Sequence, residues 1–224
     1  MCHMTDTNLT KGALRTPKAA AIAGIVFSIL LIIIFVLIRL SLPTDPSSAM
    51  KVFQARASTI ALAISLIPFA GVAFLWFIGV VRDRLGQLED RLFATVFVGS
   101  GLLFLAMLFC AAAVVSSTAL AFPPSAEKPI DESTFAFARN LTFTLMNVYA
   151  TKMAAVFMFT ISTVAAYTRF VPRYVAYLGY PLALLILLGS QYWEWSFFIF
   201  PLWVLLLSSQ ILIENYRHVL RPRS

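Results

Sequence analysis

The chain has 224 residues, of which 60% are hydrophobic and only 12% are charged, and its formal net charge is +7. Soluble domains carry about 25% charged residues, so this composition excludes an ordinary soluble protein. Several apolar runs reach the ~20 residues that cross a bilayer. Because these runs lack the alternation of barrel strands, we expect an all-α, polytopic membrane helix bundle.

Six apolar segments follow one another along the chain. The first comes after Pro17, which suits the first turn of a helix. Its residues Ala20, Gly24 and Ser28 are spaced four apart, and this stripe of small residues predicts the close approach of another helix. We expect a cytoplasmic tail over 1–18, a basic cytoplasmic tail over 214–224, and six transmembrane helices at about 19–40, 57–81, 92–121, 140–168, 174–190 and 196–213.

The middle segments carry two irregular features. Pro68 lies near the middle of the second segment, where a proline removes a backbone donor and kinks the helix. The kink either serves packing or shapes a binding cavity. The third and fourth segments have about 30 residues each, or ~45 Å of helix, against a hydrocarbon core of ~30 Å. We therefore expect them to form a hairpin that projects on the side of the loop 122–133.

The fourth segment also carries polar residues at helical spacing. Asn140, Thr144, Asn147 and Thr151 lie at offsets of 0, 4, 7 and 11, which places them on one face of an α-helix. A polar stripe of this kind either joins helices or lines a cavity.

Lys152 is the only charged residue well inside an apolar segment, which makes it a candidate functional residue. At ~1.5 Å per residue it lies about 24 Å from Thr168 at the inner edge, hence ~6 Å below the outer edge of a ~30 Å core. Its side chain can extend over that distance to the headgroups. The alternative is an ion pair with Glu194, the acid expected near the same interface.

The basic residues indicate the orientation of the bundle. With the N-terminus inside, 11 of the 17 lysines and arginines fall on the inner side, whereas the outer loops are neutral. We therefore expect both termini to be cytoplasmic. This distribution at helix ends also explains the positive charge without nucleic acid as a partner.

The sequence gives no sign of catalysis or of a bound cofactor. It contains no hydrolase, metalloprotease or phosphate-loop motif, so no catalytic residue is assigned. Cys2 and Cys110 are expected at different depths, which argues against a disulfide. His3 and His218 are expected outside the bilayer, so no metal or haem site within the membrane is predicted.

Two resemblances concern the turn after the second segment. Gly79, Asp83, Arg84 and Gly86 fit the pattern G-x-x-x-D-R-x-G, which resembles the cytoplasmic loop motif of the major facilitator transporters. That family has twelve helices, and Gln87 stands where it usually has a basic residue. The stretches 11–24 and 76–104 resemble bacterial integral membrane proteins of similar length. This second resemblance implies the bacterial cytoplasmic (inner) membrane and no particular activity.

Three classes of function are compatible with these features. The first expectation is an accessory or structural subunit of a larger membrane complex, since buried charge is scarce and a hairpin projects. The alternative is a small oligomeric permease or channel that uses the polar face of the fourth segment. A lipid-active enzyme or sensor is the third. The expected partners are membrane lipids and other membrane subunits, or further copies of the chain.

Overall fold

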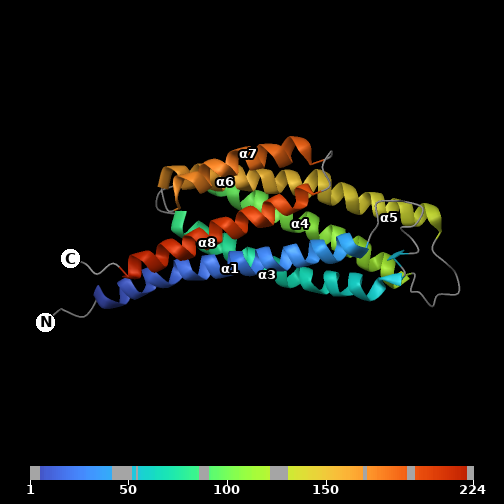
Figure 1. Ribbon diagram of the computed structural model, residues 1–224, viewed down its shortest axis with the longest axis horizontal. Helices are drawn as coiled ribbons and strands as arrows, with labels where there is room; N and C mark the ends of the chain where they lie inside the picture. Colours follow the sequence, from blue (N-terminus) through green and yellow to red (C-terminus); the bar gives the residue numbers. More distant parts are fainter. Residues whose placement is uncertain are drawn as a thin grey trace.

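The computed structural model describes residues 6–41, 52–53, 55–85, 91–121, 131–168, 171–190 and 195–220, and these residues are almost entirely helical. The expectation of an all-α fold is therefore confirmed for the described part of the chain. The helices lie roughly along one common axis (Figure 1). Their bounds are α1 (Asp6–Ser41), α3 (Ala57–Leu85), α4 (Arg91–Ala121), α5 (Glu132–Thr144), the π-helix η1 (Leu145–Ala150), α6 (Thr151–Thr168), α7 (Arg173–Gly189), the 3₁₀ turn η2 (Ser196–Phe198) and α8 (Ile199–Leu220).

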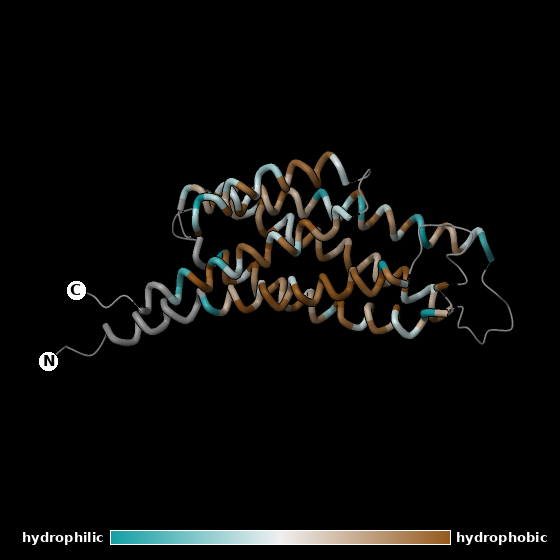
Figure 2. The backbone as a smooth tube through the Cα atoms, viewed as in Figure 1, coloured by the Kyte–Doolittle hydropathy of each residue, from teal (hydrophilic) through white to brown (hydrophobic). Residues whose placement is uncertain are grey.

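Five of these helical stretches are long and apolar enough to cross a membrane, which indicates a multi-pass membrane protein. The continuous helix α5–η1–α6 supplies the longest of them, with 36 residues from Glu132 to Tyr167. The sixth apolar helix, α7, has 17 residues and is shorter than the other five. Figure 2 shows hydrophobic residues along the middle of the bundle and hydrophilic residues gathered toward its ends.

The stripe of small residues on α1 brings three helices together, as the sequence predicts. Ala20, Gly24 and Ser28 are all buried. A Cβ atom placed on Gly24 would lie 2.0 Å from Oγ of Ser208 in α8 and 2.9 Å from the ring of Phe77 in α3. Because only glycine leaves room for this approach, Gly24 sets the distance between α1 and its two neighbours.

A cluster of phenylalanine rings occupies the centre of the bundle. Phe74 of α3 lies at its middle, with ring centroids 4.3 Å from Phe27, 5.1 Å from Phe157 and 5.6 Å from Phe104. Offset and edge-to-face pairs at such distances are the favoured aromatic geometries. The cluster contains seven buried rings from α1, α3, α4, α6 and α8, namely Phe27, Phe74, Phe77, Phe97, Phe104, Phe157 and Phe200.

Two cation–ring contacts join α1 to the continuous stretch formed by Trp195, η2 and α8, one at each end of that stretch. Nζ of Lys18 lies 5.1 Å from the ring centre of Tyr216, and the guanidinium of Arg39 lies 5.7 Å from that of Trp195. In both helices the contact residues are about 21 positions apart, or ~32 Å at 1.5 Å per residue. The N-terminal end of α1 and the C-terminal end of α8 accordingly lie at the same end of the bundle (Figure 1).

A second, smaller apolar cluster lies at the opposite end of the bundle. The rings of Phe53 and Phe135 meet edge to face at 5.6 Å, and Ile60 of α3 is buried with them. We call this group the end cluster. Helix α5 and the adjoining ends of α3 and α4 extend past the ends of α1 and α8 on this side (Figure 1). The observed helices therefore have the lengths and placement that a projecting hairpin requires.

The phenylalanine cluster gives a direct test of the fold. We expect Phe74→Ala to lower the free energy of unfolding by about 3–5 kcal/mol, because it removes a buried ring and leaves a cavity. Phe69→Ala, on the same helix but 66% exposed, should have a much smaller effect. Denaturation of the purified variants in detergent measures both values, and equal losses would contradict a central role for Phe74.

Candidate functional site

The long helix α5–η1–α6 contains one wide turn, and two of the polar residues expected on this helix, Asn147 and Thr151, lie at it. In this π-turn the backbone N–H of Thr151 donates to the carbonyl of Met146, five residues earlier. Turns of this type hold one extra residue and occur often at functional sites. The candidate site is therefore built around η1.

The backbone carbonyl of Asn147 is the centre of this site. It accepts hydrogen bonds from the hydroxyl of Thr151 in its own helix and, at 3.0 Å, from the hydroxyl of Ser190 at the end of α7. The side-chain amide of Asn147 donates to the carbonyl of Phe143 at 3.1 Å. Asn147 and Thr151 are only 2% and 6% exposed. The bond from Ser190 joins α7 to the helix α5–η1–α6 at the level of the π-turn.

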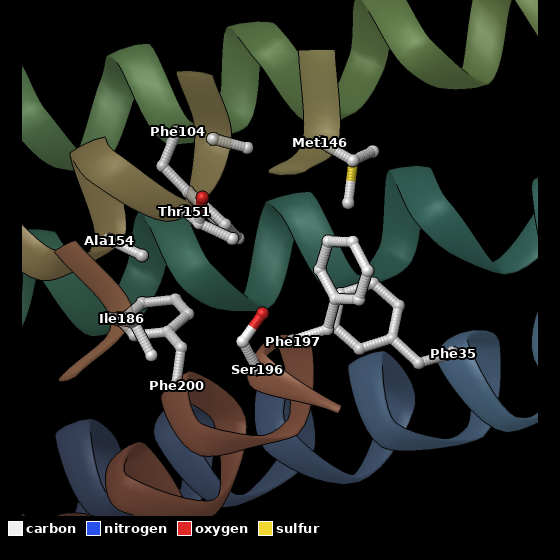
Figure 3. Close-up of a pocket in the computed structure, with 10 residues that line it drawn as sticks. Phe35, Phe104, Met146, Thr151, Ala154, Ile186, Ser196, Phe197 and Phe200 are labelled. Atoms are coloured by element: carbon white, nitrogen blue, oxygen red, sulfur yellow. The ribbon is translucent and has the colours of Figure 1, made fainter. Parts of the chain in front are cut away.

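A small cavity lies beside the π-turn, where η1 faces η2. Its volume is about 10 Å³, the lower limit of the space that one water molecule needs. Figure 3 shows Thr151 on one wall and the hydroxyl of Ser196 directed into the space from the other. The lining residues are Phe35, Phe104, Met146, Ala150, Thr151, Ala154, Ile186, Ser196, Phe197 and Phe200.

The predicted polar stripe is only partly gathered at this site. Asn147 and Thr151 are buried and bonded to each other, whereas Thr144 is half-buried and Asn140 is exposed on α5. The π-turn explains the difference, because its extra residue changes the 3.6-residue repeat on which the common face was based. The side chains of Asn147 and Thr151 bond within their own helix, and the stripe does not continue as one buried face into α5.

Lys152 lies next to the site but does not take part in its bonds. Its side chain is half-buried, and within the described part of the chain no hydrogen bond or ion pair of Lys152 is present. The expected partner Glu194 lies outside the described residues. The geometry around Lys152 is thus compatible with a side chain that reaches toward the headgroups.

The remaining sequence candidates lie away from the cavity. Pro68 is exposed on α3, and no residue of α3 lines the cavity. Gly79 is also exposed, with open space around its Cα, so it makes no close helix contact. Asp83 and Arg84 lie in the last turns of α3, and Gly86 lies outside the described residues.

Two residues of the candidate site, Ser190 and Ser196, could not be recognised from the sequence. Each lies at the end of an apolar segment, where a serine is ordinary and has no periodic partner. Ser190 pairs with Asn147 across 43 positions of the chain. Ser196 is 2% exposed, and its hydroxyl has no hydrogen-bond partner among the described residues.

Helix α7 is attached to α6 by further polar and small residues. The Tyr180 hydroxyl donates to Thr163 at 3.0 Å. A Cβ atom on Gly179 would lie 3.0 Å from Nε1 of Trp203 and would collide with the hydroxyl of Ser162. Such contacts let membrane helices associate. They are needed because lipid tails are as apolar as the side chains, so the hydrophobic effect gives little attraction between helices.

Few titratable groups lie near the site. The described residues contain no group of three His, Cys, Asp or Glu side chains that could hold a metal ion. At the start of α5, a hydrogen bond from the Ser133 hydroxyl lowers the pKa of the exposed Asp131 carboxyl. This carboxylate lies before the first residue of α5, about 16 positions from Asn147.

The bond between α7 and the π-turn can be tested by mutation. We expect Ser190→Ala to lower the free energy of unfolding by about 0.6 kcal/mol, the average for hydrogen bonds between membrane helices, and by no more than about 1.7 kcal/mol, the largest value measured for them. Ser65→Ala is the control, because Ser65 is exposed and bonds only to Leu62 of its own helix. Chemical denaturation of both variants in the same detergent provides the comparison, and an equal effect would contradict the role of Ser190.

Lys152→Met tests the interpretation of Lys152. If the lysine only extends to the headgroups, the methionine variant should fold and its melting temperature should stay within about 2 °C of the original. Lys152→Arg keeps the charge and serves as the control. Loss of folding in Lys152→Met, with Lys152→Arg intact, would show that the charge is required.

Comparison of the chain with models of protein families, with curated proteins and with solved structures finds no match.

Proposed function

We propose that this protein is an accessory or structural subunit of a larger complex in the bacterial cytoplasmic membrane. The observation that carries the proposal is the filled interior of the bundle. Seven phenylalanine rings occupy its centre, and the cavity beside them measures about 10 Å³. Pockets for small molecules are usually about 300–1,000 Å³, so this cavity is too small for such a ligand.

Six membrane crossings with both termini in the cytoplasm are part of the proposal. Helices α6 and α8 run in the same direction, and Ser190 at the end of α7 bonds to Asn147 near the start of α6. Helix α7 must therefore run back along α6 between them. Its exposed side chains include Leu184, Leu185 and Leu188, which suits contact with lipid.

The contacts between α1 and α8 supply a scale for the depth of the bundle. Lysine, arginine, tyrosine and tryptophan are the residues that settle at the two membrane interfaces. The ~32 Å between the Lys18–Tyr216 and Arg39–Trp195 contacts equals one hydrocarbon core of ~30 Å. The first pair then marks the cytoplasmic interface and the second pair the outer one.

On this scale helix α5 stands outside the membrane. Phe137 is about 30 residues from Tyr167, or ~45 Å along the helix, which is ~15 Å more than the hydrocarbon core. Phe137 and Phe143 are nevertheless 68% and 54% exposed. Large exposed apolar side chains beyond the hydrocarbon core mark interaction surfaces, so we assign the contact with another subunit to Phe137 and Phe143 of α5.

The alternative function is a small oligomeric permease or channel. The π-turn favours it, since such turns are common at functional sites and this one carries Asn147 and Thr151. A transport path would then have to form between copies of the chain or after a rearrangement of α5–η1–α6, because the described interior is filled.

Purification in mild detergent followed by mass spectrometry tests the subunit proposal. We expect a second membrane protein to co-elute in constant ratio with the chain. The double variant Phe137→Ala/Phe143→Ala should lose this protein, whereas Phe69→Ala, an exposed phenylalanine of α3, should retain it. Elution of the original chain alone, as a stable homo-oligomer, would overturn the proposal and favour the permease.

Cysteine labelling tests the orientation independently. In a background with Cys2→Ser and Cys110→Ser, a membrane-impermeant maleimide should label Phe137→Cys in intact spheroplasts. Tyr167→Cys, an 84% exposed position at the other end, should react only after permeabilisation. The opposite labelling pattern would reverse the proposed orientation.

A further inference from the structure

We propose that the cavity between η1 and η2 is a binding site for one water molecule, held by the hydroxyls of Ser196 and Thr151. The site is independent of the proposed function. It lies where two helices depart from α-helical geometry at the same level of the bundle, one by a π-turn and the other by a 3₁₀ turn.

The hydroxyl of Ser196 needs a partner that the surrounding described residues do not supply. Ser196 is 2% exposed, and its oxygen makes no hydrogen bond within the described part of the chain. A buried polar group without a hydrogen-bond partner destabilises the folded state. Figure 3 shows this hydroxyl directed into the cavity, so a molecule bound there would contact it.

Thr151 supplies the second hydrogen-bonding group. Its hydroxyl proton is used in the bond to the Asn147 carbonyl, which leaves the lone pairs of its oxygen as acceptors. A water molecule can donate one proton to this oxygen. Its second proton or its own lone pair is then available to the Ser196 hydroxyl, which both donates and accepts.

The size and lining of the cavity select water over other ligands. A volume of about 10 Å³ admits one molecule of that size and no larger group. Only two lining side chains carry oxygen atoms, and the rest are apolar. A bare cation needs more oxygen ligands than this, and a fully apolar cavity would remain dry.

The bound water would join Ser196 and Thr151, which share no hydrogen bond in the described part of the chain. Ser196 begins the last membrane helix, whereas Thr151 begins α6 just after the π-turn. Ser190 already links the same π-turn to the end of α7. The water therefore completes a polar connection among α6, α7 and the start of α8 at one level of the bundle.

An experimental structure of the original protein at about 2 Å resolution tests the site directly. We expect density for one water molecule within hydrogen-bond distance of Oγ of Ser196 and Oγ1 of Thr151. Ser196→Ala should lose this density while the helices keep their positions. An empty cavity, or a Ser196 hydroxyl bonded directly to a protein group, would overturn the proposal.

A double-mutant cycle tests the connection in solution. Ser196→Ala and Thr151→Val each remove one hydroxyl. If one water joins the two hydroxyls, the substitutions should not act independently. The change in the unfolding equilibrium constant of the double variant should then differ from the product of the two single changes by at least about twofold. Coupling of this size is seen between residues that share a partner. Independent effects of the two substitutions would contradict the shared water.

Ser208→Ala provides the matched control for this cycle. Ser208 is also a fully buried serine of α8 without a hydrogen-bond partner among the described residues, but it packs against Gly24. It lies 12 positions beyond Ser196, or ~18 Å along the helix. In the double variant, the changes that Ser208→Ala and Thr151→Val cause in the unfolding equilibrium constant should therefore multiply. If Ser208→Ala and Ser196→Ala were coupled equally to Thr151→Val, the proposal would also be overturned.

Discussion

The packing of the phenylalanine rings around Phe74 is the constraint on which the rest of the bundle depends. Between membrane helices the hydrophobic effect gives little attraction, because lipid tails are as apolar as the side chains. Association then rests on close van der Waals contact, which large flat rings provide when they fit. Since Phe74 contacts Phe27, Phe104, Phe157 and Phe200, four other helices are positioned against α3 at once. The same fit fills the centre of the bundle with side chains.

Helix α7 is attached by a different kind of contact, because it contributes no ring to this cluster. Gly179 admits the Ser162 hydroxyl, Tyr180 bonds to Thr163, and Ser190 bonds to the π-turn. Hydrogen bonds between membrane helices are individually weak, at about 0.6 kcal/mol on average. Helix α7 is therefore held by several small contributions along one helix, whereas the other helices share one dense centre.

The sequence predicted the helices better than it predicted the site. Long apolar runs are a strong signal, and the run predicted at 92–121 corresponds to α4 at Arg91–Ala121. The stripe through Gly24 also packs as expected, because spacing by four is a local property of a helix. The π-turn was missed, since Asn140, Thr144, Asn147 and Thr151 fit an unbroken α-helix equally well. Contacts such as Ser190 to Asn147 depend on tertiary packing, which no local pattern encodes.

The π-turn lies where one helix passes from the main core to the end cluster. Phe157 of α6 packs in the phenylalanine cluster, whereas Phe135 of α5 packs against Phe53 beside α3 and α4. An unbroken helix would have to satisfy both sets of contacts with a single 3.6-residue repeat. The extra residue of η1 relaxes that requirement. The hydroxyls of Thr151 and of Ser190 at the end of α7 both donate to the Asn147 carbonyl in this turn, so they stabilise the turn that lets the helix pack in two cores.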